Sequence, residues 1–226
     1  MAQLRFPQPA RSRSEVRYVR APEPLVFPEE ALVPESKTHL EVRTFLYRLL
    51  QFALGPEHSV GSEQFVYWNA ADPGRCLAPD VFVKLDVRDT QFGSWQTWER
   101  GGAPELAVEI VSPSDQRQRP LEEKLASYRE LGVKELVRFD PSEPEGRRLR
   151  VWDRVDGDLV ERVIAGDRTP CLAMGLAWTV RNIPATSSEV LGLRLVDDEG
   201  RLLETREEKA EARIRELEEE LRRRSP

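Results

Sequence analysis

The stretch PELAVEIVSPSD (residues 104–115) contains the run LAVEIV, which is apolar at every position except Glu109. A short run rich in β-branched residues is typical of a strand that is buried on both faces of a sheet. A carboxylate inside such a strand is costly unless it is paired, protonated or bound to a metal. Glu109 is therefore a candidate functional residue, and the alternative is a glutamate that points to solvent at a sheet edge.

The segments around this run alternate between helical and strand patterns. One helix is expected to begin at Thr38, which forms a T-x-x-E capping box with Glu41, and to end at Gly55. A second helix is expected over 120–131, with Gly132 after it. Strands are expected over residues 59–68, 78–87, 106–111 and 132–141, as a hairpin over 149–164, and in two short pieces after it. This order predicts an α/β (α+β) fold with a central mixed β-sheet flanked by helices.

The C-terminal residues have a different pattern. Thr205 and Glu208 form a second capping box, and residues 206–224 contain no glycine or proline. Apolar residues follow a and d positions for about two heptads, so a charged amphipathic helix is expected over 201–226. Two interpretations stay open: a helix that packs on its own domain or extends alone, and a helix that forms a homodimer through a coiled coil.

Composition limits the class of protein. The chain has 226 residues, of which 33% are charged, and a net charge of −6, which does not favour nucleic-acid binding by itself. Residues 1–34 hold six prolines and are expected to be an irregular lead-in. Within it, residues 1–20 carry five arginines and one acidic residue, and they are either a disordered basic arm or an arm that contacts phosphates. Residues 35–200 are expected to form the main domain. The isolated cysteines Cys76 and Cys171 indicate reduced thiols in a cytoplasmic protein.

Three residues form a candidate site. Asp80 follows Pro79 at the head of one expected strand, Glu109 lies in the next, and Lys124 lies one turn into the following helix. Adjacent strands would bring the two carboxylates within reach of one divalent cation, and Mg²⁺ prefers one or two carboxylates completed by water and phosphate oxygens. A nearby ammonium can orient the attacking water or offset charge on phosphorus. Together these residues predict a site that cleaves phosphodiester bonds, although each alone has an ordinary structural explanation.

The order of motifs resembles that of the PD-(D/E)xK nucleases, and more closely that of the Uma-type family of restriction-endonuclease-like proteins of bacteria. The motifs are PDVFV (79–83), PELAVEIVSPS (104–114), EKLASY (123–128) and GVKELVRFDP (132–141), and the similarity covers about residues 35–165. The resemblance implies a restriction-endonuclease-like core. It also implies Asp80 and Glu109 as metal ligands, assisted by the backbone carbonyl of Ile110, with Mg²⁺ or Mn²⁺ as the cofactor.

Two positions depart from the motif. The lysine of the E-x-K pattern would fall on Val111, which cannot serve. In the family that this sequence resembles, the following helix supplies the lysine, so the resemblance implies Lys124 as the third catalytic residue beside Asp80 and Glu109. Pro120 stands where relatives usually carry an aspartate.

The family also has a Glu/His pair at the opening of its first helix, and Glu35 and His39 match that pair as accessory candidates. Helical spacing puts His39 on the inward face with Val42 and Leu46. His39 is then either a hydrogen-bonded core histidine or a group at the metal site.

These observations predict a metal-dependent endonuclease that hydrolyses phosphodiester bonds in DNA, with no membrane-spanning segment. Two alternatives remain open. One is a catalytically degenerate nuclease fold that binds DNA or a protein partner without cleaving it. The other is an interaction protein that works through its C-terminal helix.

Overall fold

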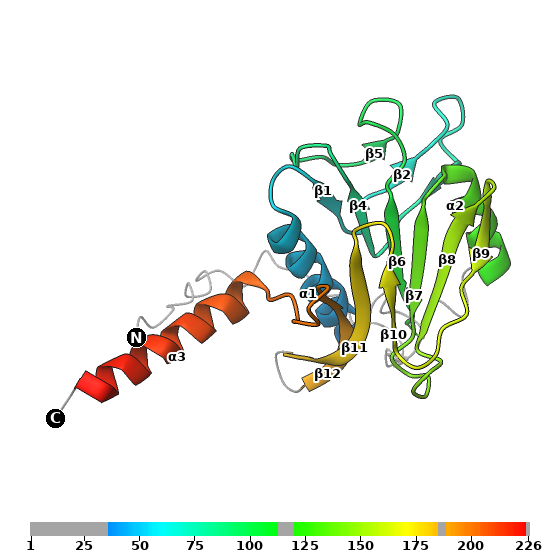
Figure 1. Cartoon of the computed structure of the whole chain (residues 1–226). Helices are drawn as coiled ribbons and strands as arrows, with labels where there is room; N and C mark the ends of the chain where they lie inside the picture. The colour runs from blue at the N-terminus through cyan, green and yellow to red at the C-terminus, as the bar shows by residue number, and fades with distance from the viewer. Residues whose placement is uncertain (1–35, 113–119, 185–188, 225–226) are drawn as a thin grey trace, which may run out of the picture. The chain divides into compact units, whose positions relative to one another are not determined.

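The strand that carries Glu109, β6 (Leu106–Ile110), lies inside a six-stranded sheet (Figure 1). The structure is a computed structural model and describes residues 36–112, 120–184 and 189–224. The strands follow the spatial order β1 (Ser59–Gly61), β4 (Val81–Lys84), β6, β7 (Glu135–Phe139), β8 (Leu149–Val155) and β9 (Asp158–Glu161). β6 and β7 are parallel and the other neighbouring pairs are antiparallel, so the sheet is mixed, as the sequence predicted.

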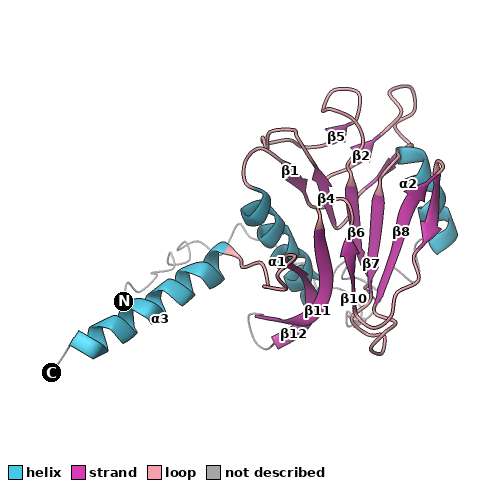
Figure 2. Ribbon diagram, viewed as in Figure 1, coloured by secondary structure: helices cyan, strands magenta, loops and turns pink. Residues whose placement is uncertain are grey.

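Three helices and two smaller sheets complete the described structure (Figure 2). The helices are α1 (Lys37–Leu54), α2 (Leu121–Leu131) and α3 (Arg206–Arg224). One small sheet contains β3 (Cys76–Leu77), β2 (Val66–Tyr67) and β5 (Trp95–Gln96), and the other contains β10 (Arg168–Cys171), β11 (Leu176–Pro184) and β12 (Glu189–Val196). The predicted fold class, a mixed sheet flanked by helices with a charged C-terminal helix, is confirmed.

The two faces of the six-stranded sheet bury different sets of side chains. One face, which includes Val108 and Ile110, packs against α1 and the sheet of β10, β11 and β12. The opposite face, which includes Ala107 and Leu136, packs against α2. Because side chains alternate along a strand, Glu109 shares the face of Ala107 and lies under α2. Alternation therefore places the carboxylate in the layer that also contains the helix with Lys124.

The first helix begins two residues earlier than the sequence predicted. Its N-cap is Ser36, whose hydroxyl accepts a hydrogen bond of 3.1 Å from the backbone N–H of His39. Thr38 is already helical, so the predicted capping box of Thr38 and Glu41 is wrong, and Glu41 instead lies 4.0 Å from Lys37. The physical reason is that serine caps a helix as well as threonine does. The earlier start puts His39 in the first turn.

Several predicted strands are shorter or divided. The strand predicted over 59–68 is two strands, β1 and β2, which belong to different sheets, because the chain turns between them at Glu63 with a φ of 65°. β4 ends at Lys84, before Asp86, which has a φ of 58°. The hairpin is confirmed as β8 and β9, with the Asp-Gly turn in the left-handed region that such turns require.

The segment after the hairpin contains more structure than two short pieces. β11 and β12 pair over eight residues each, and β10 joins them to form a three-stranded sheet. Its inner residues, such as Trp178 and Leu193, are fully buried against the main core. The segment therefore belongs to the domain core rather than to a loop.

Other sequence expectations can be compared directly with the described residues. Cys76 and Cys171 are free cysteines. The helices of the described ranges are too short or too polar to span a lipid bilayer. The predicted lead-in of residues 1–34 lies outside the described residues, as does Glu35.

Candidate active site

Neighbouring strands bring Asp80 and Glu109 to the same end of the sheet. β4 and β6 are antiparallel, and their register pairs Val81 with Val108. Asp80 directly precedes Val81, and Glu109 directly follows Val108. Continuing the antiparallel register by one position therefore sets Asp80 beside Glu109. The charge of Asp80 acts on Glu109 and contributes to raising its pKa.

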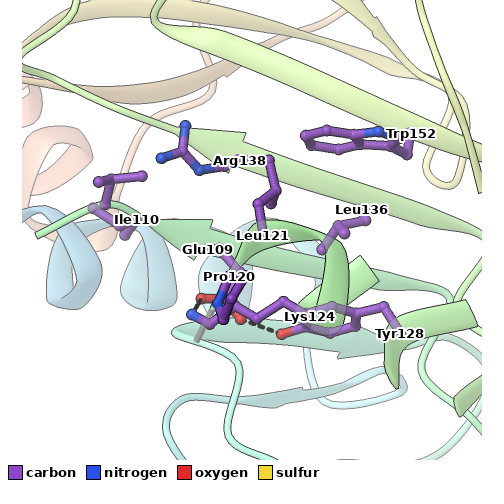
Figure 3. A pocket seen from close by; sticks show the side chains of 10 residues that line it. Glu109, Ile110, Pro120, Leu121, Lys124, Tyr128, Leu136, Arg138 and Trp152 are labelled. Atoms are coloured by element: carbon purple, nitrogen blue, oxygen red, sulfur yellow. Dashed lines mark hydrogen bonds and ion pairs between the residues drawn. The ribbon is translucent and has the colours of Figure 1, made fainter. Parts of the chain in front are cut away.

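Two side chains of α2 bind the carboxylate of Glu109. The ammonium Nζ of Lys124 donates a hydrogen bond to Oε2 of Glu109 over 2.8 Å. The hydroxyl of Tyr128, one helical turn later, donates to Oε1. Figure 3 shows both contacts as dashed lines. The structure thus brings together the strand glutamate and the helix lysine that the sequence analysis had paired, and each oxygen of Glu109 accepts one hydrogen bond.

Asp80, His39 and Ile110 form a second set of contacts. Oδ2 of Asp80 accepts a hydrogen bond of 2.6 Å from the backbone N–H of Ile110. Nε2 of His39 lies 3.1 Å from Oδ1 of Asp80 and 2.9 Å from the carbonyl oxygen of Ile110. Since the carbonyl oxygen of Ile110 can only accept hydrogen bonds, Nε2 of His39 carries a proton. His39 is therefore a buried, hydrogen-bonded histidine, and it also contacts the candidate site. Each of the two interpretations that the sequence left open describes part of this arrangement.

Burial and neighbouring charges act in opposite directions on Glu109. Its pKa is raised, mainly because burial disfavours the charged carboxylate, and the charge of Asp80 adds to this effect. The ammonium of Lys124 and the hydroxyl of Tyr128 oppose the rise. The pKa of Tyr128 is also raised by burial and by the charge of Glu109, so its phenol stays protonated and remains a hydrogen-bond donor.

The chemistry of the oxygen atoms fits a hard divalent cation. Asp80 and Glu109 supply carboxylate oxygens and Ile110 supplies a carbonyl oxygen, which are the ligand types that Mg²⁺ and Mn²⁺ prefer. A carboxylate oxygen that accepts one hydrogen bond keeps a second lone pair. No group of three or more His, Cys, Asp or Glu side chains within the described ranges could hold a metal. Two carboxylates and one carbonyl oxygen fit a cation such as Mg²⁺, which usually keeps several waters beside one or two carboxylates.

A cavity of about 280 Å³ opens beside this site. Glu109, Lys124 and Tyr128 form part of its wall, and Arg138 and Trp152 form another part (Figure 3). Arg138 is the residue of β7 that pairs in register with Glu109. Its guanidinium lies 3.7 Å from the carboxylate of Asp140, and 26% of its side chain is exposed. The cavity thus combines apolar walls with an arginine next to the glutamate.

The sequence analysis missed two of these residues. It did not identify Tyr128 as a site residue, although this buried side chain donates a hydrogen bond to Glu109. It did not single out Arg138, although a charged residue inside the strand ELVRF is the same signal that Glu109 gives in its own strand. The two departures from the motif also lie here: Val111 and Pro120 line the cavity, and Pro120 is the N-cap residue of α2.

The comparison with family models agrees with the sequence resemblance. Residues 27–183 match the model of the Uma2 family, which is described as "Putative restriction endonuclease". A crystal structure of a "putative nuclease belonging to DUF820" from Anabaena variabilis ATCC 29413 aligns with a TM-score of 0.38 and 13% identity, over 57% of this chain and 69% of that chain. No curated protein sequence matches the chain. The family description supports a nuclease-like function. Because the family match extends over more than half of the 226 residues, the protein belongs to the Uma2 family.

Proposed function

We propose that the protein is a metal-dependent endonuclease that hydrolyses phosphodiester bonds in DNA. The observation that carries this proposal is the ion pair between Lys124 and Glu109, which lies beside Asp80 in a site of hard oxygen ligands. Membership of the Uma2 family, described as "Putative restriction endonuclease", supports the same reaction class. Asp80, Glu109 and Lys124 are the proposed catalytic residues, and Mg²⁺ or Mn²⁺ is the proposed cofactor.

The proposed metal ligands are Asp80, Glu109 and the carbonyl oxygen of Ile110. A divalent cation held there would polarise a phosphoryl oxygen and make bound water a stronger nucleophile. His39 acts as a positioning residue, because its Nε2 proton contacts both Asp80 and the Ile110 carbonyl. Tyr128 holds Glu109 in one orientation through its hydroxyl. Groups of this kind, which fix the ligands, typically change metal affinity or activity by about 10–100-fold when removed.

Lys124 provides the positive charge next to the reacting atoms. Its ammonium lies 2.8 Å from Oε2 of Glu109, and 22% of its side chain is exposed, so it can be reached from the cavity. We infer that it orients the attacking water and offsets the charge that develops on the phosphoryl oxygens. A point charge with three donors suits this role because it can bind a carboxylate and a water at the same time.

The proposal is tested first by metal removal. Purified protein is expected to convert supercoiled plasmid DNA to nicked or linear DNA with Mg²⁺ or Mn²⁺, and EDTA is expected to abolish the conversion. Binding of Mn²⁺ measured by calorimetry, without DNA, gives a second readout. If the protein retards DNA in a gel but cuts it with neither cation, the catalytically degenerate binding module replaces this proposal.

Arg138 is expected to bind a phosphate of the substrate near the cleavage point. Its guanidinium lies on the wall of the cavity, next in register to Glu109, and arginine is a common phosphate contact in DNA-binding proteins. Arg138→Ala is expected to weaken DNA binding about 5–30-fold, which corresponds to roughly 1–2 kcal/mol, and to reduce the slope of log K against log salt by about 1. Fluorescence anisotropy at several salt concentrations measures both quantities.

The matched control for Arg138 is the neighbouring arginine of β8. Arg150 pairs in register with Arg138, but its guanidinium already binds both carboxylate oxygens of Glu161, at 2.7 and 2.8 Å. Arg150→Ala is therefore expected to leave the salt slope unchanged. Equal slopes for the two variants would exclude a specific phosphate contact at Arg138.

A further inference from the structure

The first turn of α3 is attached to the domain by a set of buried polar contacts. The capping box forms as the sequence predicted, with Thr205 and Glu208 each donating a backbone N–H to the other's side chain, over 2.8 and 3.2 Å. The carboxylate of Glu208 also binds the guanidinium of Arg194, which is only 5% exposed, at 2.8 and 3.1 Å. The ammonium of Lys209 lies 5.8 Å from the ring centre of Phe52. The domain therefore holds the start of the helix.

Beyond this turn, the described part of α3 has no buried residue. Its large apolar side chains are instead exposed: Ile214 by 55%, Leu217 by 42% and Leu221 by 64%. With Ala210 they follow the spacing 4, 3, 4, which places all of them on one stripe of the helix. Most helices in proteins gain their stability by packing such an apolar stripe against a partner rather than from helix propensity alone. The stripe has the pattern of an interface.

We infer that a second copy of this chain covers the stripe, and that the two copies of α3 form a parallel two-stranded coiled coil. In the heptad, Ile214 and Leu221 take a positions, and Ala210 and Leu217 take d positions. Among parallel coiled coils, a β-branched residue at a combined with leucine at d, as at Ile214 and Leu217, favours two strands. This inference does not depend on the proposed nuclease activity.

The charges beside the stripe favour the same partner and the same direction. Arg206 and Arg213 occupy g positions of the heptad. In a parallel pair, each g residue faces the e residue that lies five positions later on the other helix. These e positions are Glu211 and Glu218, so both contacts join opposite charges, and symmetry repeats them on the other side. The helix is thus complementary to a second copy of itself.

An antiparallel pair would place like charges together. Its e positions would face each other, which sets Glu211 of one copy against Glu218 of the other. The single favourable g contact, between Arg213 and Glu220, would only offset this repulsion. Such charge contacts decide the orientation of a coiled coil more than its affinity. The parallel arrangement is therefore the one that the sequence of α3 favours.

Light scattering and sedimentation of the full chain test the dimer. A mass of about twice the 26.0 kDa of the monomer is expected at tens of micromolar protein. Leu217→Lys is expected to give a monomer with an unchanged melting temperature, because Leu217 contributes nothing to the described core. Val163→Lys, at an apolar residue that is 99% exposed but lies outside α3, is expected to remain a dimer. A monomeric wild type, or a dimer that survives Leu217→Lys, would overturn the inference.

The direction is tested by a cysteine at the d position nearest the domain. In a Cys76→Ser background, Ala210→Cys is expected to form a disulfide between two copies under mild oxidation, because identical positions meet in a parallel pair. In an antiparallel pair, position 210 would face position 221, and the two cysteines would lie about 16 Å apart along the axis, at 1.5 Å per residue. A dimer that does not cross-link would overturn the parallel direction.

The charge contacts are tested by a swap. Glu218→Arg is expected to raise the dissociation constant of the dimer, because it faces Arg213 of the second copy. Adding Arg213→Glu to the same chain is expected to restore the wild-type constant, since the contact then joins opposite charges again. If the double variant is weaker than the single variant, the proposed g to e contact is wrong.

Discussion

Glu109→Gln is expected to reduce metal-dependent DNA cleavage by about 10²–10³-fold, the usual effect of losing one charged group that acts on the transition state. Glutamine keeps the size of the side chain but removes the charge that would hold the cation. Lys124 and Tyr128 donate to different oxygens of Glu109, so the NH₂ group that replaces one of these oxygens faces one of the two donors. The buried contact that is lost costs about 1–3 kcal/mol of stability.

Two measurements separate the catalytic effect from the structural one. The initial rate of plasmid nicking at saturating Mn²⁺ reports on catalysis, and Mn²⁺ calorimetry reports on the ligand set without any DNA. The matched control is Glu105→Gln, which alters a buried glutamate just before the same strand, bound to Lys84 at 2.8 Å. That control is expected to lose stability but to keep cleavage. Cleavage that survives Glu109→Gln at the rate of this control would refute the assignment of Glu109.

Lys124→Met is expected to reduce cleavage by a similar factor of about 10²–10³. The substitution keeps a flexible side chain of similar length in α2 but removes the ammonium that contacts Glu109. Because Lys124 opposes the rise of the Glu109 pKa, its loss should raise that pKa further. A carboxylate with a higher pKa keeps its proton to a higher pH, so Mn²⁺ binding should move to higher pH in this variant.

Lys124→Arg tests whether the site requires only a positive charge at this position or specifically a lysine. Arginine restores the charge next to Glu109, so the pH dependence of Mn²⁺ binding should return toward that of the wild type. Its planar fork cannot place a donor where the ammonium lies, and cleavage should stay low. The control is Lys134→Met, at a lysine that is 69% exposed and lies 3.7 Å from Glu105. Full cleavage by Lys124→Met, or equal losses in both Met variants, would exclude Lys124 from the proposed mechanism.

Local features of the fold could be predicted from the sequence. The Gly132 that ends α2, the Asp-Gly turn of the hairpin and the capping box of Thr205 all depend on residues within one turn of each other. The errors arose where two local choices were nearly equal. Ser36 and Thr38 can both cap a helix, and the run over 59–68 reads as one strand although the backbone turns at Glu63. Tertiary packing decided between these choices.

The candidate site could be predicted only in part. Glu109 could be recognised from the sequence because burying a carboxylate in an apolar strand costs free energy whichever residue is its partner. His39 stayed ambiguous because helical spacing shows that a side chain points inward but not what it meets there. Its contacts with Asp80 and Ile110 join segments 41 and 71 residues apart in the chain, and no local pattern describes them.

The sequence by itself determined that α2, β6 and the hairpin of β8 and β9 form, which residue of β6 is charged and which stripe of α3 is apolar, because periodicity and the cost of burying a charge are local properties. Only the tertiary structure decided that the ammonium of Lys124 reaches Glu109, that Tyr128 donates to the same carboxylate, and that Arg138 lies on the neighbouring strand in register with it. These contacts depend on how α2 packs on the sheet and on the register of β6 with β7. Both are set by the packing of the whole core and not by any single segment.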